Sequence, residues 1–275
     1  MTTLLETLTK GTAYLEKKGV DSPRLTMELL LAHALKMKRM QLYLEFEKPL
    51  TEQELTILRE LLKKRGERIP LQHIIGSVDF YGREFLCDAR ALIPRPETEE
   101  LIAFILKLDL PNPLSILDLC SGSGIIGLTL KAELGAEATI TLADLSSDAL
   151  SLSRENAEKL GLEAQFIESD CFDNITESYD LIVCNPPYVA DGFEISAEVQ
   201  HDPALALFSG KDGLDLIRKI IPKSTKHLNP EGWLALEIGH DQSNQLETLL
   251  NPEFKNITVY SDMENIPRFP VAQKA

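Results

Sequence analysis

The sequence predicts an α/β protein in which a smaller N-terminal helical domain precedes a doubly wound, mostly parallel sheet. Three observations predict this fold. Short apolar runs alternate with helical patterns from Ser115 onwards, a glycine-rich turn joins the first run to its helix, and residues 1–65 have leucines at helical spacing. With 275 residues, 44% of them hydrophobic, the chain is long enough for one large core and one small core.

Helix start signals organise the N-terminal domain, which we place at residues 1–68. Leucines at helical spacing near the N-terminus predict the first helix. Ser22 is a candidate N-cap, and Pro23 occupies the first helical position after it. Thr51 and Glu54 have the spacing of a capping box at the start of a further helix. A helical bundle is therefore predicted.

Residues 69–95 have a different character and are predicted to form a β-hairpin linker. This stretch is rich in β-branched and aromatic residues and is interrupted by Gly76 and Gly82. Residues 96–275 form the predicted sheet domain, which opens with a helix from Glu97. Within it, strands are predicted at 115–119, 139–143, 164–168, 180–184 and 232–238, and helices near 124–134, 147–160 and 213–227.

The net charge of −15 is unevenly distributed. Residues 1–85 carry 14 Lys and Arg against 12 Asp and Glu, whereas residues 86–275 carry 14 against 31. The sheet domain therefore has a net charge of −17 and repels a phosphate backbone. We do not expect DNA or RNA to be its main substrate.

Targeting signals and metal-ligand patterns are not evident in the sequence. No apolar run is long enough to span a bilayer, and the first 20 residues do not read as a secretory signal, so we expect a cytoplasmic protein. The four cysteines form no C-x-x-C pair and have no histidine at zinc-ligand spacing. We expect no metal and no disulfide.

A glycine-rich turn predicts a nucleoside cofactor. Gly122, Gly124 and Gly127 spell G-x-G-x-x-G between a predicted strand and a predicted helix, where the backbone must turn tightly and approach a ligand. Asp144 ends the next strand, 20 residues after Gly124, which suits a carboxylate that holds both ribose hydroxyls. A nicotinamide dinucleotide and S-adenosylmethionine both fit this pattern. The alternative is a glycine turn with an unrelated surface acid.

The segment Asn185-Pro186-Pro187-Tyr188 distinguishes between these cofactors. It follows a predicted strand at the sheet edge where ligands bind. The Asn185 side chain and the Pro186 carbonyl offer two acceptors, which match the two donors of a planar NH₂ group. Pro187 stiffens the turn, and Tyr188 can cover the planar group. Hydride transfer has no use for such an acceptor pair, so S-adenosylmethionine is the predicted cofactor.

Asp170 follows the weaker strand predicted at 164–168. Its carboxylate can accept a hydrogen bond from the adenine amino group of the cofactor, and the neighbouring side chains can cover the ring. A helix N-cap or a turn is the alternative role for Asp170.

Several segments resemble one enzyme family. The Asn185–Tyr188 motif is similar to the N-P-P-Y motif of amino methyltransferases, which act on adenine, cytosine, guanine or glutamine NH₂ groups. Ile93–Glu99 is similar to the I-P-R-P-(D/E)-T-E segment of the HemK/PrmC family, and Asp202–Leu207 resembles its E-P-x-x-A-L. Asp262 and Arg268 resemble its closing D…R, and the resemblance extends over nearly the whole chain.

The HemK/PrmC family consists of protein-(glutamine-N5) methyltransferases that modify peptide-chain release factors. The resemblance implies a Rossmann-like, class I S-adenosylmethionine-dependent fold, with a Gly-Gly-Gln glutamine of the release factor as substrate and the helical domain as the part that recognises it. It implies cofactor-binding roles for Cys120, Ser121, Gly122, Ser123, Gly124, Asp144, Asp170, Cys171, Phe172 and Asn185. It implies catalytic roles for Asn185, Pro186, Pro187 and Tyr188.

The chain departs from the family pattern at three positions. Cys120 stands where the family often has Gly, and its Cβ can shift the methionine pocket. Cys171 stands where an aromatic residue is common, so adenine stacking would fall to Phe172 or be weaker. Asp202 replaces the usual Glu, which keeps the charge and shortens the reach.

Direct methyl transfer needs no general base before the transfer step, because the proton can leave the nitrogen afterwards. We therefore assign no catalytic role to His33, His73, His201, His227 or His240. Two alternatives are an adenine or guanine N-methyltransferase acting on DNA or RNA, and a cofactor-binding adaptor without catalysis. The acidic sheet domain opposes the first, and the intact glycine turn and Asn185 oppose the second. We expect the protein to be a monomer.

Overall fold

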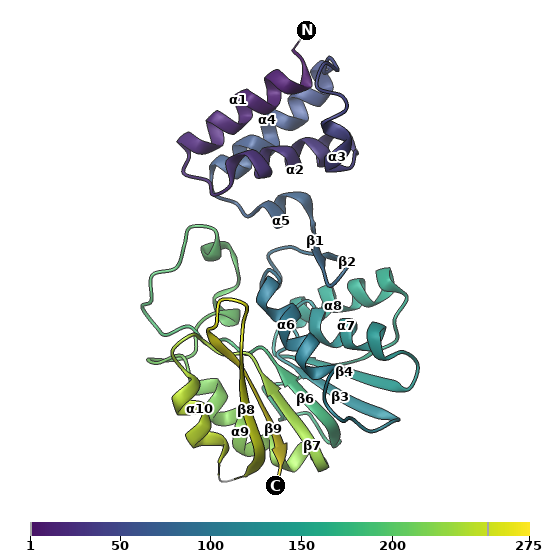
Figure 1. The fold of residues 1–275 in the computed structure, drawn as a ribbon, viewed down its shortest axis with the longest axis vertical. Coiled ribbons are helices and arrows are strands. Elements are labelled where there is room, and N and C mark those ends of the chain that lie inside the picture. The colour runs from purple at the N-terminus through teal and green to yellow at the C-terminus, as the bar shows by residue number, and fades with distance from the viewer. Residues whose placement is uncertain (1, 252) are drawn as a thin grey trace. The chain divides into compact units, whose positions relative to one another are not determined.

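The computed structural model describes residues 2–251 and 253–275 (Figure 1). The chain divides into two compact units: unit 1 contains Met1–Ser77 and Ile195–His201, and unit 2 contains Val78–Glu194 and Asp202–Ala275. The chain therefore leaves unit 2 at Glu194 and returns to it at Asp202. Among the described residues, no helix is long and apolar enough to cross a membrane.

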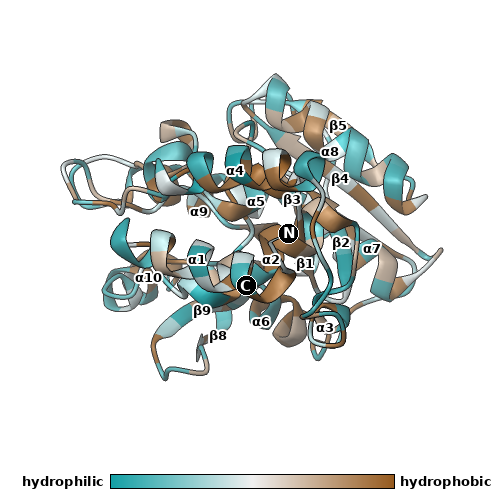
Figure 2. Cartoon of the chain, turned by 90° about the horizontal axis from the view of Figure 1, so that it is seen from above, coloured by the Kyte–Doolittle hydropathy of each residue, from teal (hydrophilic) through white to brown (hydrophobic). Residues whose placement is uncertain are grey.

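Unit 1 is a helical bundle, as predicted. Its helices are α1 (Leu4–Lys17), α2 (Pro23–Leu35), α3 (Arg39–Leu42), α4 (Glu52–Gly66) and α5 (Leu71–Ile75), with the short 3₁₀ helix η1 (Val199–His201). Leucines of α1, α2 and α4 form its core together with Met27. Gly11 lets α1 and α2 approach closely, because a Cβ at Gly11 would lie 2.3 Å from the Met27 sulfur. Figure 2 shows hydrophilic and hydrophobic residues alternating along α4, as expected of a helix with one buried face.

One predicted helix start is confirmed in full, and the other is confirmed only in part. The capping box at α4 is confirmed: the Thr51 hydroxyl accepts from the Glu54 N–H at 3.3 Å, and the Glu54 carboxylate accepts from the Thr51 N–H at 2.7 Å. Pro23 does occupy the first turn of α2. The predicted Ser22 cap is wrong, because Ser22 adopts a left-handed conformation (φ 46°) and its side chain makes no capping hydrogen bond.

The segment predicted as a hairpin linker contains one more element than expected. Strands β1 (Ser77–Phe80) and β2 (Arg83–Leu86) form a separate two-stranded sheet, so the hairpin itself is confirmed. The short helix α5 precedes it and ends at Gly76, which has a left-handed conformation. Phe80 and Phe85 of the hairpin are buried in a core of unit 2.

A seven-stranded sheet organises unit 2, with strand order β5-β4-β3-β6-β7-β9-β8. The first five strands in this order are parallel, and β9 is antiparallel to both of its neighbours. The strands are β3 (Leu114–Leu119), β4 (Ala138–Asp144), β5 (Gln165–Glu168), β6 (Tyr179–Cys184), β7 (Leu228–Leu236), β8 (Phe254–Ser261) and β9 (Pro267–Lys274). The helices are α6 (Pro96–Ile105), α7 (Ile125–Leu134), α8 (Ser147–Leu160), α9 (Asp215–His227) and α10 (Ser243–Leu250), with η2 (Ala204–Ala206).

Side-chain alternation along the central strands gives the sheet two hydrophobic faces. On β6, Ile182 and Cys184 point into a core with α9 and α10, whereas Leu181 and Val183 point into a second core with α6 and α7. Figure 1 shows α9 and α10 on one side of the sheet and α6, α7 and α8 on the other. The doubly wound, mostly parallel fold is therefore confirmed.

The sheet has its topological switch at β3. The chain continues from β3 through α7 to β4 on one side, whereas β6 pairs with β3 on the other side. The loops that follow β3 and β6 therefore diverge at the carboxyl edge of the sheet, which is where open α/β sheets bind ligands.

Candidate functional site

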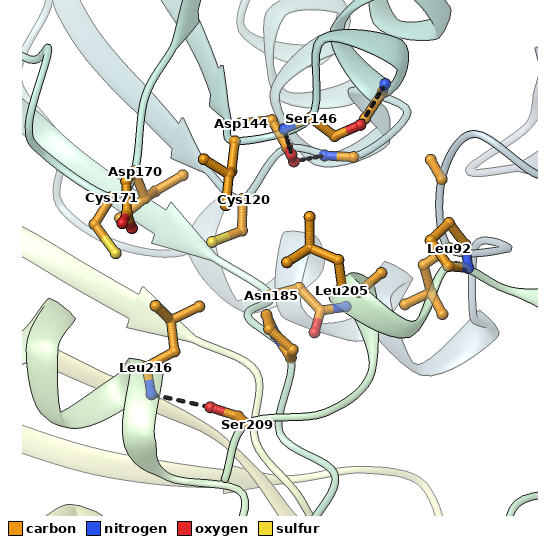
Figure 3. A pocket seen from close by; sticks show the side chains of 18 of the residues that line it. Leu92, Cys120, Asp144, Ser146, Asp170, Cys171, Asn185, Leu205, Ser209 and Leu216 are labelled. Atoms are coloured by element: carbon orange, nitrogen blue, oxygen red, sulfur yellow. Dashed lines mark hydrogen bonds between the residues drawn. The ribbon is translucent and has the colours of Figure 1, made fainter.

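A pocket of about 360 Å³ lies at this carboxyl edge. Four loops that follow parallel strands contribute to its wall through Cys120, Asp144, Asp170 and Asn185, and each loop was singled out from the sequence. Figure 3 shows these side chains around one hollow, although they come from distant parts of the chain. The strand register explains this, because Leu119 pairs with both Ala143 and Cys184, so three strands end at the same level.

The glycine turn after β3 has the backbone conformation that its composition predicts. Gly122 and Gly124 have φ of 54° and 79°, in the left-handed region that favours glycine. Gly127 serves packing instead, because a Cβ there would lie 2.4 Å from the Leu142 side chain. Cys120 also has a left-handed φ of 58°, which explains why glycine suits this position in the family that the sequence resembles.

Two side chains of α8 hold the glycine turn in place. The Ser153 hydroxyl donates to the Gly122 carbonyl at 2.7 Å, and the Asn156 amide donates to the Ser123 carbonyl at 3.0 Å. Both side chains are fully buried. The sequence analysis missed them because a buried Ser and Asn on a helix carry no motif.

Asp144 is fixed with its carboxylate at the pocket wall. One oxygen accepts from the Gly122 N–H at 2.8 Å, and the other accepts from the Ser146 N–H at 2.9 Å. Burial raises the pKa of Asp144, and these backbone hydrogen bonds oppose the rise. A carboxylate oxygen can accept more than one hydrogen bond, so both oxygens can still accept from neighbouring hydroxyls of a ligand.

Asp118 lies beneath the glycine turn and is almost completely buried. Its Oδ2 accepts from the Gly127 N–H at 2.8 Å, whereas its Oδ1 has no hydrogen-bond partner. Burial raises the pKa of Asp118 to about 7, and the nearby Asp144 acts in the same direction. No role for Asp118 was predicted from the sequence.

The loop after β5 places Asp170 and Cys171 at the pocket but not Phe172. Phe172 is buried and stacks on the His227 ring, with centroids 4.7 Å apart and an interplanar angle of 9°. The Phe172 ring is therefore packed in the core, and its stacking on adenine stays a prediction. Cys171 lines the pocket in its place, and burial raises the pKa of its thiol to about 12.

Asn185 is the polar side chain at the end of β6, and it lines the pocket. Its Oδ1 is buried and has no hydrogen-bond partner within the protein. A buried acceptor without a partner costs free energy, and such groups in native structures usually mark a ligand, a water or a functional role. The site can therefore satisfy a donor that a ligand brings.

The other residues of the Asn185–Tyr188 motif differ in whether they line the pocket. Pro187 lines the pocket, whereas Pro186 and Tyr188 do not contribute to its wall. The Tyr188 hydroxyl lies 3.5 Å from a carboxylate oxygen of Glu237, so the phenol faces that buried acid. Ser121, Ser123 and Gly124 likewise shape the glycine turn without lining the pocket.

The chain after the motif forms the opposite side of the pocket. Pro203, Leu205 and Phe208 line it, and Leu205 is 56% exposed. Asp202 anchors this segment, because its buried carboxylate accepts from Arg95 Nη2 at 3.0 Å and from the Ile93 N–H at 3.4 Å. The two segments that resemble I-P-R-P and E-P-x-x-A-L therefore bind one another, and Asp is long enough for this contact.

The closing pair from the sequence, Asp262 and Arg268, also forms a contact. Arg268 Nε donates to the Asp262 carboxylate at 2.6 Å across the turn that joins β8 to β9. Among residues 2–251 and 253–275, no group of three or more His, Cys, Asp and Glu side chains could hold a metal ion.

Two family models match the chain. The model described as the PrmC N-terminal domain matches residues 6–76, and the model described as the methyltransferase small domain matches residues 102–203. The first model thus covers most of the helical part of unit 1, and the second covers strands β3 to β6 with the loops that follow them.

Curated relatives match over most of their length. The release factor glutamine methyltransferase of Deinococcus radiodurans is 37% identical over 278 residues, which is 99% of each chain. That of Koribacter versatilis is 35% identical over 279 residues, again 99% of each chain. That of Streptococcus pneumoniae is 44% identical over 195 residues, which is 70% of each chain.

Solved structures share the fold at lower identity. A 16S rRNA methyltransferase of T. thermophilus, in complex with AdoMet and guanosine, has a TM-score of 0.54 at 21% identity and covers 72% of this chain and 50% of its own. A methyltransferase of Pyrococcus furiosus has a TM-score of 0.53 at 17% identity, and the match covers 71% of this chain and 90% of the other. This level of identity indicates a common fold only.

Proposed function

The chain belongs to the family of release factor glutamine methyltransferases, and from this we propose that it transfers a methyl group from S-adenosylmethionine to the side-chain amide nitrogen (N5) of a glutamine in the Gly-Gly-Gln motif of a peptide-chain release factor. The observation that carries the proposal is the unpartnered, buried Oδ1 of Asn185 at the pocket wall. An amide NH₂ group is the donor that this acceptor lacks.

The residues at the pocket fit S-adenosylmethionine. Asp144, held by two backbone N–H groups, offers both carboxylate oxygens to a ribose. The glycine turn lets the backbone at Gly122 approach the ligand. Asp170 also lines the pocket, and its carboxylate can accept from the adenine amino group. When bound, S-adenosylmethionine supplies an electrophilic methyl group on a positively charged sulfur.

The work of the protein is to orient the nitrogen and to stabilise its developing charge. A glutamine amide nitrogen is a poor nucleophile, because its lone pair is delocalised into the carbonyl. As it becomes alkylated it gains positive charge, so its N–H groups become stronger donors. Asn185 Oδ1 and the Pro186 carbonyl would accept from them, more strongly in the transition state than in the ground state. Pro187 stiffens the turn that carries both acceptors.

Substrate recognition is proposed to fall to unit 1. The pocket is lined entirely by residues of unit 2, which leaves the helices α1–α4 outside the cofactor site. A folded release factor is much larger than the pocket, so a second surface is needed to select it. We also propose that the protein is a monomer, and that it is cytoplasmic because its proposed substrate acts in the cytoplasm.

The test uses the purified protein, methyl-labelled S-adenosylmethionine and three acceptors offered separately: an intact release factor, the same factor with Gln of Gly-Gly-Gln changed to Glu, and total RNA or DNA. We expect label on the first acceptor alone, and mass spectrometry should locate it on the glutamine side chain. Label on nucleic acid but not on the release factor would replace this function by that of a nucleobase methyltransferase. Equal labelling of the Glu-bearing factor would refute an amide target.

A further inference from the structure

The residues that follow β7 contact the chain on both sides of Asn185, although they do not line the pocket. The Glu237 N–H donates to the Cys184 carbonyl at 3.0 Å, immediately before Asn185. The Gln242 side-chain amide donates to the Tyr188 carbonyl at 3.0 Å, three residues after Asn185. One short segment, from Glu237 to Gln242, therefore holds the Asn185–Tyr188 turn at both ends.

The Glu237 side chain adds a second contact to this turn. It is only 2% exposed, and its Oε2 accepts from the Thr98 hydroxyl at 2.7 Å. Its Oε1 lies 3.5 Å from the Tyr188 hydroxyl. Both neighbouring groups are hydroxyls that can donate, and an ionised carboxylate only accepts. The ionised form of Glu237 therefore accepts from both hydroxyls at once, whereas protonation turns one of its oxygens into a donor, so that one hydroxyl must reverse its role.

Gln242 is equally constrained. It is 4% exposed, its amide also donates to the Asp212 carbonyl at 3.2 Å, and its Oε1 accepts from the Gly239 N–H at 2.9 Å. The Tyr188 backbone that it binds has little room to move, because a Cβ at Gly213 would lie 2.1 Å from the Tyr188 oxygen. A change at Gln242 would therefore alter the turn locally, because the Tyr188 backbone has no room to shift and replace the lost contact.

Resting on the proposed function, we propose that Glu237 and Gln242 are positioning residues for methyl transfer, which hold the Asn185–Tyr188 turn so that Asn185 Oδ1 meets the target amide. Neither residue reaches the pocket, so each acts through the turn and not on the substrate. A displacement of about 1 Å at a reacting group can reduce a rate by about 100-fold, so small shifts of this turn matter.

The charges around Glu237 give this positioning a pH dependence. Burial raises its pKa to about 7; the Thr98 hydrogen bond opposes the rise, Glu97 on α6 adds to it, and Arg268 on β9 opposes it. The Tyr188 phenol faces Glu237 from the loop after β6, and Arg95 lies close enough to act on that phenol. Since the ionised carboxylate accepts from both hydroxyls, turnover should fall as the pH drops through about 7 and Glu237 becomes protonated.

The kinetic test compares Glu237→Ala, Glu237→Gln and Gln242→Ala with wild type on intact release factor. The control variant is Glu247→Ala, an exposed acid on α10. At pH ~8 we expect Glu237→Ala and Gln242→Ala to lower kcat by about 10- to 100-fold, with the affinity for S-adenosylmethionine within about twofold of wild type. Glu237→Gln is neutral at every pH and keeps one acceptor, so it should have the lower kcat that wild type shows below pH 7, and the inflection near pH 7 should disappear.

A spectroscopic test does not depend on turnover. The side-chain ¹⁵NH₂ resonance of Asn185, identified by its absence from the Asn185→Ala spectrum, should shift in Glu237→Ala. In wild type it should also move between pH ~6 and pH ~8, and it should stay fixed in Glu237→Gln. If the protein fails to methylate any release factor, the proposed function falls, but this resonance still tests the positioning. An unmoved Asn185 resonance, or an undiminished kcat in both Ala variants, would overturn the inference.

Discussion

Glu198 and Arg68 form a two-pronged ion pair within unit 1. The Arg68 Nε donates to one oxygen of the Glu198 carboxylate at 2.6 Å, and Arg68 Nη2 donates to the other at 2.6 Å. Arg65, which is almost completely buried, donates to the first oxygen at 2.9 Å. These contacts make Ile195–His201 part of the helical unit, although the chain on either side of this segment belongs to unit 2.

The first prediction follows from this ion pair. Glu198→Ala leaves the buried Arg65 and the partly buried Arg68 without their carboxylate. We expect the free energy of unfolding to fall by about 2–4 kcal/mol, somewhat less than for a fully buried pair because Glu198 and Arg68 are partly exposed. Chemical denaturation at neutral pH measures it. The control is Glu194→Ala, an exposed acid in the same loop. Equal stability of the two variants would show that the pair contributes nothing.

The second prediction concerns the pH dependence of stability at Asp118. Burial raises its folded pKa to about 7, above its usual value of 3.8. A raised pKa favours the protonated form in the folded state, so its contribution to stability is fully present below pH 3.8 and is lost as the pH rises through about 7. Between pH ~4 and pH ~8, the free energy of unfolding of wild type should fall by roughly 1–3 kcal/mol relative to that of Asp118→Asn.

Denaturation of both proteins at a series of pH values checks this difference. Asp148→Asn, at an exposed position in the first turn of α8, serves as the control for loss of one acidic charge. If the curves for wild type and Asp118→Asn run parallel over the whole range, Asp118 does not titrate as the structure implies.

The third prediction concerns the cofactor. Asp144→Ala removes both acceptors for a ribose, together with the hydrogen bonds that the carboxylate accepts from the Gly122 and Ser146 N–H groups. We expect the affinity for S-adenosylmethionine to fall by about 1.5–3 kcal/mol, which is about 10- to 100-fold. Calorimetry on the folded variant measures this, with Asp148→Ala as the control. Unchanged affinity would remove Asp144 from the site.

The sequence predicted the parallel part of the sheet well, because the strands β3, β4 and β6 are mostly apolar and are bounded by turns. The C-terminal elements α10, β8 and β9 were not predicted. β8 lies at the sheet edge, where only Phe254 is buried and Lys255, Asn256 and Thr258 are polar, and β9 contains Pro267 and Pro270, which count against a strand. These two strands form through pairing with each other and with β7, which is a tertiary effect.

The candidate site likewise contains some residues that the sequence predicts and others that it does not. Asp144 and Asn185 were predictable because each ends a strand and forms part of a local motif. Glu237, Gln242, Ser153 and Asn156 were not, because they act through contacts with residues 30 or more positions away in the chain. The stacking of Phe172 on His227 was not predictable either, because the sequence does not reveal contacts between distant residues.

The last prediction tests the amide acceptor itself. Asn185→Ala removes the unpartnered Oδ1 from the pocket wall, and it removes no hydrogen bond that the protein makes with that atom. Stability should therefore survive, as Pro186 and Pro187 still restrict the turn. The affinity for S-adenosylmethionine should change little. Turnover on release factor should fall by about 100- to 1,000-fold, the scale for one preorganised transition-state hydrogen bond.

Asn185→Asp is the matched variant for this prediction. It keeps an acceptor of the same size at the same place, but it adds a negative charge that must be desolvated beside the cofactor's sulfonium. We expect its turnover to lie between those of Asn185→Ala and wild type, because acceptance is retained while the local electrostatics change. Single-turnover kinetics separate the chemical step from binding in all three proteins. A fully active Asn185→Ala enzyme would show that the target nitrogen is held by other groups, and the Pro186 carbonyl would then be the acceptor to examine.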